Sequence, residues 1–484
     1  MGRGSGMHPS GTVWRQVAPI LLTAALLLLV LPAVAAAAPQ PVLAPVNPDY
    51  AEAVAKRAFV RPSYEPRTDI LRLGALPDPV LTHKGPQTHR VVRDELPAAY
   101  DLRDHNKLTA VRDQAPYGTC WAFATMGVLE SYLMPRQRTD FSEDNLVNYA
   151  GFDTGDPYEH GGNYTMSLAY LLRRSGPKWE QADVYGTPEY TRNAKTQKWI
   201  GGAYLLPPLD DPELVELAKS LIMEVGAVGT MMYWDEEDTR YDPAYASYYY
   251  DGEPNVNHAV CIVGWDDGFP RTSFLAGNQP SEDGAWLIRN SWGTSFGDGG
   301  YFWISYSDTA LGCGNNLVLD RVGNPRQGTR LYGHDRLGYT GEMGFAANVA
   351  SDTAWMASRY RATRRERVTG VGFYMTSGGK ATVYVGRTKR TLRRVGTANL
   401  YLPGYYTVDL RKKLKLKKGQ RFVVAVKVRT PGYEFPIALQ SPTDIAVCKA
   451  TSGMSWVSPD GRRWTDATRL DEGTAVCLKA ITRR

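Results

Sequence analysis

Three short segments of the chain carry residue types that together could cleave an acyl bond. Cys120 opens an apolar stretch, His258 precedes the apolar run 259–265, and Asn290 follows the apolar run 286–289. A cysteine attacks a carbonyl carbon as its thiolate, and because the pKa of a free thiol is about 8.5, it needs help to ionise. A histidine can act as the base, and an asparagine oxygen can hold one imidazole nitrogen so that the other faces the sulfur. For each residue taken alone, a structural role is the competing interpretation.

The elements predicted around these residues would hold them in fixed positions. Residues 121–133 are predicted to form a helix, so Cys120 lies at a helix N-terminus, where the helix dipole stabilises a thiolate. The runs 259–265 and 286–289 stand between Gly-rich turns, which indicates β-strands. His258 and Asn290 then lie at strand ends, with rigid backbone beside them.

Further predicted elements divide the chain into a mixed region and an all-β region. Residues 166–174 and 212–224 are predicted helices, and the second follows Asp210 and Asp211, as helix starts prefer. Residues 301–306 add a strand, so this region is helical first and β-rich second. Residues 326–484 contain no predicted helix, and their strands favour a β-sandwich or barrel. The predicted strands there are 368–374, 381–385, 405–410, 421–428 and 475–481.

The first 95 residues are predicted to be processing segments. Arg3 and Arg15 lie in a polar start, an apolar run covers 17–31, and small residues follow up to Ala38. This is the pattern of a secretory signal peptide over residues 1–38, and the run is shorter than the ~20 residues that span a bilayer. We therefore expect a secreted protein, extracellular or at the cell surface, with the periplasm as the alternative. Residues 39–95 are Pro-rich, with one short helical stretch predicted at 50–59, and are interpreted as a propeptide or linker.

Composition and charge narrow the function classes. The chain has 484 residues, 43% hydrophobic and 22% charged, which excludes a collagen, a coiled coil or disorder throughout. Residues 326–484 hold 30 Lys and Arg against 11 Asp and Glu, whereas the rest of the chain holds 26 against 39. The dense basic run 411–421 could bind an acidic glycan or an anionic cell surface. A solvated strand face is the simpler interpretation of that run, and nucleic acid is not an expected partner.

The three segments together resemble the papain family of cysteine peptidases. The shared motifs are Gly118-Thr-Cys120-Trp-Ala-Phe123, Asn257-His258-Ala-Val260 and Asn290-Ser-Trp-Gly293. The resemblance begins at residues 96–103, continues through 141–147 and ends near residue 310. The C-terminal part is similar to the lectin-like β domain that bacterial and archaeal members of this group carry. The implied fold is α+β: a two-lobed catalytic domain, helical lobe then β-barrel lobe, at 96–322, and a β-sandwich at 326–484.

This resemblance assigns roles to residues of this chain. Cys120 would be the nucleophile, His258 the general base and acid, and Asn290 the residue that orients His258. Gln114, six residues before Cys120, would complete the oxyanion hole. Gly161, Gly162 and Trp292 are assigned to substrate binding, and Trp292 would also cover the His258–Asn290 hydrogen bond.

The expected reaction is hydrolysis of a peptide bond in a protein or peptide substrate, through a thioester on Cys120. No cofactor or metal ion is expected, since the remaining histidines show no ligand spacing, and the chain is expected to be a monomer. Cys448 and Cys477 are the expected disulfide pair. Two alternatives remain: a binding or adhesion protein with a peptidase-like scaffold, and a thioester transferase such as a transpeptidase.

Overall fold

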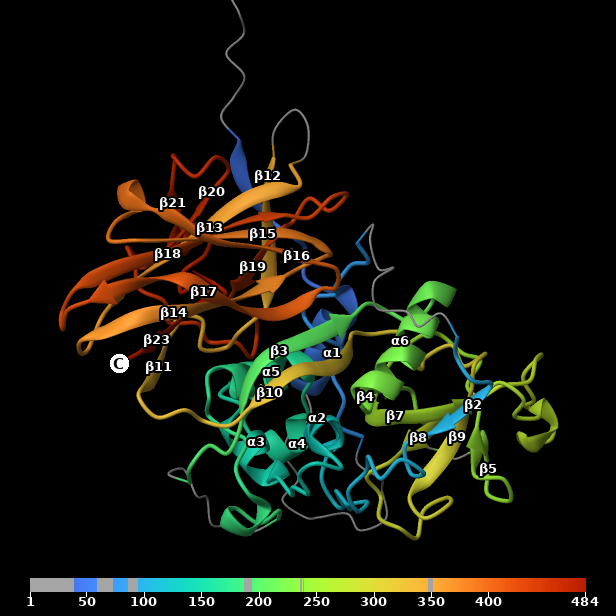
Figure 1. Ribbon diagram of the computed structural model, residues 1–484. Coiled ribbons are helices and arrows are strands. Elements are labelled where there is room, and N and C mark those ends of the chain that lie inside the picture. The colour runs from blue at the N-terminus through green and yellow to red at the C-terminus, as the bar shows by residue number, and fades with distance from the viewer. Residues whose placement is uncertain are drawn as a thin grey trace, which may run out of the picture. The chain divides into compact units, whose positions relative to one another are not determined.

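Helix α2 (Cys120–Leu133) lies at the centre of the N-terminal half of the protein. The computed structural model describes residues 39–58, 73–85, 95–186, 194–235, 237, 239–346 and 351–484, and the expected signal peptide 1–38 lies outside them. Every α2 residue except Tyr132 is buried. A helix that is apolar all round must be covered all round. Helices α3 (Glu143–Tyr149) and α5 (Tyr164–Leu172) pack on it from one side, and strand β7 (His258–Asp266) packs on it from the other (Figure 1).

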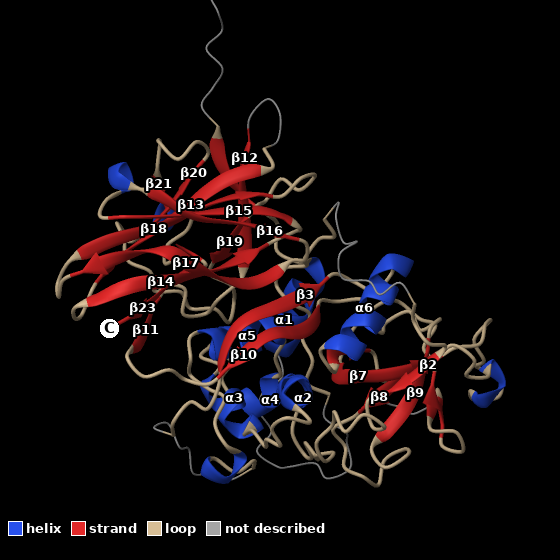
Figure 2. Ribbon diagram, in the orientation of Figure 1, coloured by secondary structure: helices blue, strands red, loops and turns tan. Residues whose placement is uncertain are grey.

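The helices begin where the sequence provides caps. The Ser142 and Asn163 side chains accept hydrogen bonds from backbone N–H groups in the first turns of α3 and α5. Asp211 caps α6 (Pro212–Glu224) in the same way, and a proline occupies its first turn, so the predicted range is confirmed. One further short helix, α4 (Pro157–His160), and the 3₁₀ turns η1 (Glu180–Ala182) and η2 (Arg271–Ser273) complete this half (Figure 2).

Antiparallel strands form the second lobe of this half. Their order is β4 (Val228–Met232), β7, β8 (Ala285–Arg289) and β9 (Tyr301–Ser305). β4 and β7 are paired from Val228–Ile262 to Met232–His258, and β7 and β8 include the pair Cys261–Arg289. This register places the start of β7 beside the end of β8. Short strands at the margin are β2 (Ala99–Asp101), β5 (Tyr241–Asp242) and β6 (Ser247–Tyr248).

Two long strands connect the two halves of the chain. Strand β10 (Asn316–Gly323) pairs with β4 on one side and with β3 (Trp199–Leu206) on the other. β3 in turn pairs with β17 (Gly404–Leu416), through Gly404–Tyr204 to Tyr406–Gly202. One hydrogen-bonded sheet therefore runs from the β lobe into the C-terminal half, which was not predicted.

The C-terminal half is a β-sandwich, as expected. One sheet has the order β16-β15-β18-β13-β20-β21, and β11-β23-β14-β17 and β12-β19-β22 form the opposing layers. Its core includes Met356, Phe373, Phe422, Val424 and Leu478, all without exposed surface. The strands are β11 (Thr329–Tyr332), β12 (Gly341–Ala346), β13 (Thr353–Arg361), β14 (Glu366–Met375), β15 (Gly379–Gly386), β16 (Arg393–Leu400), β18 (Arg421–Arg429), β19 (Ile437–Gln440), β20 (Ser455–Ser458), β21 (Thr465–Asp466), β22 (Ala475–Val476) and β23 (Leu478–Arg483), with the 3₁₀ turns η3 (Lys389–Thr391) and η4 (Ala467–Arg469).

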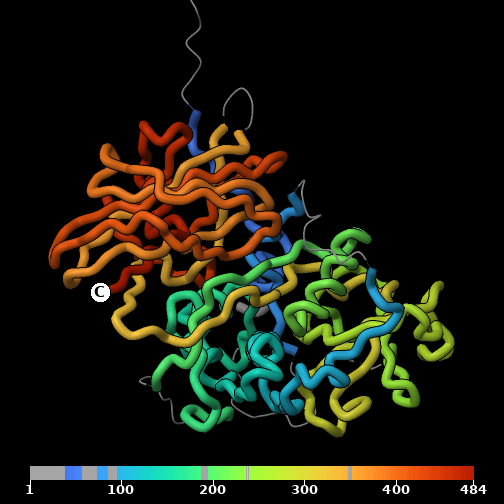
Figure 3. Tube along the Cα trace, viewed as in Figure 1, coloured from blue at the N-terminus to red at the C-terminus, as the bar shows by residue number. Residues whose placement is uncertain are grey.

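The described residues 39–58 and 73–85 pack on both halves. Strand β1 (Gln40–Leu43) pairs with β12 of the sandwich, from Gln40–Ala346 to Leu43–Met343, and is drawn in blue in Figure 3. Helix α1 (Pro48–Ala58) follows, close to the helix predicted at 50–59. Residues 73–85 lack a regular element and are mostly buried. No helix in the described ranges is long and apolar enough to cross a membrane.

Candidate active site

His258 and Asn290 meet at the ends of neighbouring strands. His258 is the first residue of β7 and Asn290 follows the last residue of β8. The Asn290 Oδ1 atom lies 2.8 Å from His258 Nε2, and the backbone N–H of Ser291 donates to the same oxygen at 2.8 Å. Because its oxygen accepts from that N–H, the amide presents an acceptor to the imidazole. Nε2 then carries the ring proton when the imidazole is neutral.

Trp292 covers this pair with its ring. The indole stacks on the imidazole of His258 with centroids 4.6 Å apart and an angle of 26° between the planes. Trp234 and Phe296 meet the same indole edge-on at 4.8 and 4.9 Å. This aromatic layer packs on the imidazole plane of His258, beside its hydrogen bond with Asn290, which is the position expected for Trp292 from the sequence.

Cys120 lies at the first position of α2, beside the segment that carries His258. Its Sγ atom accepts a hydrogen bond at 3.4 Å from the backbone N–H of Ala259, the residue after His258. The packing of α2 against β7 brings the two segments together, and Cys261 Sγ donates to the Ala124 carbonyl at 3.3 Å across the same contact. The helix N-terminus and the start of the strand therefore meet at the sulfur.

The imidazole is fully enclosed, and this burial lowers the pKa of His258 to about 4, although the Asn290 hydrogen bond opposes the shift. Burial disfavours the charged ring because water no longer solvates it. His258 Nδ1 has no hydrogen-bond partner among the residues that the structure describes. With Nε2 held by Asn290, Nδ1 is the nitrogen left to exchange a proton with the thiol.

Gln114 is anchored through both ends of its side-chain amide. Ser291 Oγ donates to Gln114 Oε1 at 2.6 Å, and Gln114 Nε2 donates to the Tyr117 carbonyl at 2.9 Å. The backbone is fixed as well, because Gln114 N–H donates to the Ser291 carbonyl at 2.8 Å and the Tyr185 hydroxyl donates to the Gln114 carbonyl at 2.8 Å. Ser291, the residue after Asn290, thus orients the side-chain amide of Gln114, which the sequence assigned to the oxyanion hole.

A stretch of the chain's own N-terminal segment lies along this site. Gly162 N–H donates to the Gly74 carbonyl and Leu76 N–H donates to the Gly162 carbonyl, both at 2.9 Å. Ala75 N–H donates at 3.0 Å to the carbonyl of Asn257, the residue before His258. Residues 74–76 are therefore extended between the glycine predicted to bind substrate backbone and the segment that carries His258.

Glycine is required on both sides of this contact. A Cβ on Gly162 would lie 2.6 Å from the ring of Trp121, the residue after Cys120. A Cβ on Gly74 would overlap the carbonyl of Gly118, two residues before Cys120. Gly161 ends α4 with φ of 78°, a left-handed conformation that suits glycine, and no backbone hydrogen bond joins it to residues 74–76.

Asp78 anchors the same segment beyond the site. Its carboxylate accepts from Thr165 N–H at 2.9 Å and from Asn315 Nδ2 at 3.1 Å, and Asn163 Nδ2 donates to the Pro77 carbonyl at 3.0 Å. Asp78 is completely buried, and this burial raises its pKa to about 6. The segment is thus held by named polar contacts as well as by its backbone.

The expected disulfide is corrected by the structure, which holds Cys448 and Cys477 as free thiols. Cys477 is buried and its Sγ donates to the Gly338 carbonyl at 3.1 Å. Burial raises the pKa of Cys477 well above its ordinary value. The backbone therefore provides the contact for Cys477 that the disulfide was expected to make.

Two family profiles match the chain. Residues 96–319 match the papain family cysteine protease, and residues 331–482 match the lectin-like domain. The chain joins a papain-family domain to a lectin-like domain. The fold inferred from the sequence is thereby confirmed in both parts.

Solved structures are similar to this chain over most of its length. The cysteine protease and lectin-like domains of Cwp84, a surface layer associated protein of Clostridium difficile, match with a TM-score of 0.76 and 23% identity, over 92% of this chain and 98% of that chain. The clostridial cysteine protease Cwp84 after propeptide cleavage matches with a TM-score of 0.71 and 25% identity, over 80% and 99%. These matches support the two-part architecture.

Curated relatives match the papain-family domain. The viral cathepsin of Heliothis zea nuclear polyhedrosis virus is 29% identical over 47% of this chain and 57% of its own length. Pro-cathepsin H of Medicago truncatula is 30% identical over 48% of this chain and 63% of its own. The chain thus spans about three fifths of the length of these relatives.

The papain-family domain brings Cys120, His258, Asn290 and Trp292 together, and Gln114 reaches the group through Ser291. Ser291 had no predicted role, although it stands inside the Asn290–Gly293 motif. Asn257 and Ala259 contribute backbone groups to the site, and neither contribution was predicted. A backbone contact does not depend on residue type, so the sequence could have indicated a role for Ser291 but not for Asn257 or Ala259.

Proposed function

We propose that this protein is a secreted cysteine peptidase that hydrolyses peptide bonds with Cys120, His258 and Asn290. The observation that supports this most is the His258 imidazole, held by Asn290 at 2.8 Å, with the next residue of the same strand contacting Cys120 Sγ. Nucleophile, base and orienting group are the three parts that acyl transfer through a cysteine needs.

The reaction follows from these positions. His258 Nδ1 takes the proton of Cys120, and the thiolate attacks the peptide carbonyl. The oxyanion is stabilised by the backbone N–H of Cys120 and by the Gln114 amide, whose loss would cost about 100- to 1000-fold in rate. The imidazolium then protonates the leaving amine and a thioester forms on Cys120. Water, activated by neutral His258, releases the acid product and restores the thiol.

The segment 39–95 acts as an inhibitory propeptide in this proposal. Its residues 74–76 use the backbone groups of Gly162 and Asn257, which a substrate would otherwise use. Residues 1–38 are the export signal, 96–322 the catalytic domain and 326–484 the lectin-like sandwich. The working form is a monomer that acts on protein substrates outside the cytoplasm, with Gly161, Gly162 and Trp292 in the binding cleft.

A digest of a denatured protein mixture by the wild-type chain and by Cys120→Ala tests the peptidase. Mass spectrometry reads the new peptide ends and the N-terminus of the enzyme itself. Cleavage by the wild type alone, with a new enzyme N-terminus near residue 95, is the expected result. Two results together would favour the binding-protein alternative. Both chains are inactive and remain uncut from residue 39, and Cys120 of the wild type reacts with a thiol label, which shows that residues 74–76 have moved off the site.

The molecule that accepts the acyl group from the thioester distinguishes the transferase alternative from the peptidase. An amine-bearing peptide added to the digest competes with water for the thioester. A ligated product in excess of the hydrolysed one would identify a transpeptidase. An acidic glycan or an anionic cell surface remains the predicted partner of the basic C-terminal domain, and this prediction is independent of the peptidase chemistry.

A further inference from the structure

One end of the sandwich carries cations that face one another across strands. In the sheet β17-β14-β23, Lys415 is paired with Arg367, and Arg367 is paired with Arg483. In the other sheet, Arg361 is paired with Arg421. Neighbouring strands lie about 4.8 Å apart, and like charges directly opposite each other destabilise a sheet. The paired cations therefore repel one another and destabilise the two sheets at this end of the sandwich.

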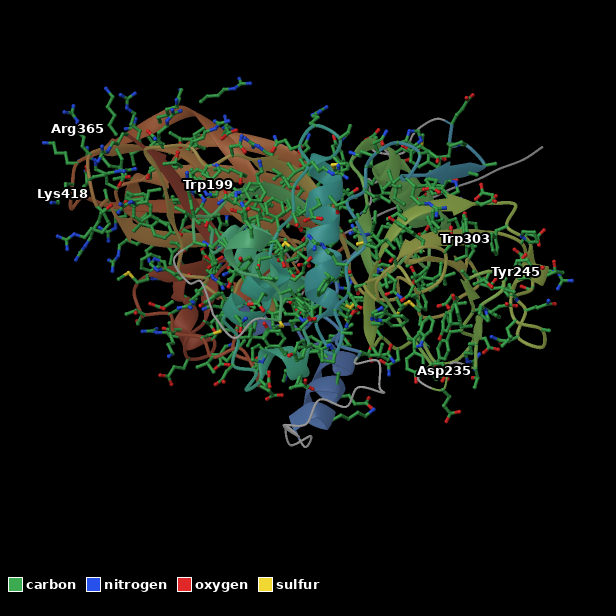
Figure 4. All side chains as sticks on the ribbon, turned by 90° about the horizontal axis from the view of Figure 1, so that it is seen from below. Trp199, Asp235, Tyr245, Trp303, Arg365 and Lys418 are labelled. Carbon is green, nitrogen blue, oxygen red and sulfur yellow. The ribbon has the colours of Figure 1, made fainter. Side chains whose placement is uncertain are left out.

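The loops that join the two sheets extend the same charge. Arg365 lies between β13 and β14, and Lys417 and Lys418 lie between β17 and β18. Gly419 N–H donates to the Ala362 carbonyl at 2.7 Å and Ala362 N–H donates to the Gln420 carbonyl at 2.9 Å, so the loops are joined to each other. Figure 4 labels Arg365 and Lys418 at the same edge, where nitrogen-tipped side chains gather. We call this surface the cationic end; its exposed members are Arg361, Arg365, Arg367, Lys415, Lys417, Lys418, Arg421 and Arg483.

Carboxylates do not compensate this charge. Within the described residues, none of the eight side chains of the cationic end forms an ion pair. The nearby Glu366 is buried, where it accepts from the Thr482 hydroxyl at 2.6 Å and meets Arg364 at 3.5 Å. The run 410–433 contains no Asp or Glu at all. The positive field therefore reaches solvent without internal neutralisation.

Sequence segments far apart contribute to the cationic end. The run 411–421 supplies only four of its members, and the others come from β13, β14, the loop between them and β23. Guanidinium groups bind carboxylate and phosphate oxygens in pairs, and a row of them at strand spacing suits a ligand with repeated anionic groups. A single small anion would bind one guanidinium group and leave the other cations of the row without an anionic partner.

We propose that the cationic end binds an anionic polysaccharide, whose repeated acidic groups lie along the rows Lys415–Arg367–Arg483 and Arg361–Arg421. Within the described residues, no exposed large hydrophobic or aromatic side chain lies on β13, β14, β17, β18 or β23. The stacking platform that single-stranded nucleic acids need and the apolar side chains that would enter a lipid surface are therefore missing from these strands. An anionic glycan requires neither feature, and it offsets the like-charge repulsion between strands. This proposal does not rest on the peptidase activity.

Titration of the full chain carrying Cys120→Ala with polygalacturonate tests the proposal, with uncharged dextran and a single-stranded oligonucleotide as comparisons. The variant Arg367→Glu/Lys415→Glu/Lys418→Glu is expected to lose at least about tenfold in affinity near 0.1 M salt, with the log–log salt slope reduced by about two. The matched control Lys449→Glu/Arg462→Glu/Arg469→Glu makes the same charge change at exposed sites elsewhere in the sandwich. It is expected to bind within about threefold of the parent chain.

A second pair of variants keeps the result clear if the triple variant unfolds. Lys417→Gln/Lys418→Gln lies in an exposed loop and should weaken polygalacturonate binding without changing the Tm. Arg367→Gln should weaken binding and raise the Tm, because it relieves repulsion on both sides. Unchanged binding in these variants, equal binding of dextran, or tighter binding of the oligonucleotide would overturn the proposal. Peptide hydrolysis by the same variants in the wild-type background should be unchanged.

Discussion

Gly74 packs against Gly118 so closely that a side chain at position 74 would overlap the Gly118 carbonyl. Gly118 is two residues before Cys120, and Gly74 is the residue whose carbonyl accepts from Gly162 N–H at 2.9 Å. Residues 74–76 thus lie on the loop before Cys120 with backbone against backbone. The fit of this segment depends on the absence of one Cβ.

Gly74→Ala should therefore lift the propeptide from the site. The added methyl group meets backbone atoms, which cannot rotate away, so residues 74–76 must shift. We expect the unprocessed variant to hydrolyse a fluorogenic peptide at least about tenfold faster than unprocessed wild type, if the shift costs about 1.4 kcal/mol or more. Gly323→Ala is the control, since no atom lies within 4 Å of its Cβ position. Equal rates of hydrolysis by unprocessed Gly74→Ala and unprocessed wild type would contradict this position of residues 74–76 on the site.

The pH dependence of propeptide release should depend on two opposing groups. Burial lowers the pKa of His258 to about 4. If release of residues 74–76 opens the ring to water, its pKa returns toward the ordinary value of about 6.5, and protonation between about pH 6.5 and 4 then favours the uncovered state. Burial raises the pKa of Asp78 to about 6, so protonation between about pH 6 and 4 favours the covered state. The two shifts are similar in size and opposite in sign, so release in wild type should change little over this range.

Asp78→Asn removes one side of this balance. Only the His258 contribution then remains, so release and self-processing should accelerate as the pH falls from 7 to 4.5, by about tenfold or more relative to wild type. The rate of conversion to the form beginning near residue 95, read by mass spectrometry at each pH, provides the measurement. The exposed Asp104→Asn is the control. Parallel pH profiles for Asp78→Asn and wild type would show that Asp78 carries no such role.

Ser291→Ala should lower the rate through Gln114. The Ser291 hydroxyl donates to Gln114 Oε1 at 2.6 Å, and without it the amide loses one of the two contacts that orient it. The loss of a hydrogen bond worth about 1 kcal/mol predicts a fall in kcat of about five- to tenfold with a smaller change in KM. Ser295→Ala, four residues later and exposed, should have wild-type kinetics. A change confined to KM would place Ser291 in substrate binding instead.

Gly162→Ala should damage stability and catalysis together. Its Cβ would lie 2.6 Å from the ring of Trp121, which is buried and follows Cys120. Overpacking of this kind costs about 1–3 kcal/mol, which should appear as a lower Tm, and the displaced Trp121 should reduce kcat. Gly314→Ala, with no atom within 4 Å of its Cβ position, should leave both unchanged. A Gly162→Ala variant with a lower Tm and a normal kcat would show that Gly162 is needed for packing and not for catalysis.

Elements with strong local signals were predicted closely. Helix α6 matches the predicted range 212–224, because Asp211 and the following proline mark its start. The helix predicted from Trp121 begins at Cys120, and the papain-family motifs located the residues that meet at the site. The all-β character of the C-terminal half was visible in its alternating runs.

Long-range contacts were not predictable from the same signals. The pairing of β3 with β17 joins Tyr406 to Gly202, about 200 residues apart, through backbone groups of ordinary residues. Residues 74–76 have no hydrophobic period, and they are held beside Gly162 and Asn257 by carbonyl and N–H groups. The Cys448–Cys477 pairing was inferred from location in one domain, whereas the backbone satisfies Cys477. In each case the deciding partner is a main-chain atom, which residue identity does not report.

The pairing of β1 with β12 has a consequence for the kinetics of activation. Residues 40–43 are hydrogen-bonded to the sandwich, and a cut near residue 95 would not by itself break this pairing. After such a cut the two pieces are separate molecules held by noncovalent contacts, so their parting is a bimolecular equilibrium that depends on total concentration. A concentrated preparation should then stay latent although fully cut, and the same preparation should become active on dilution.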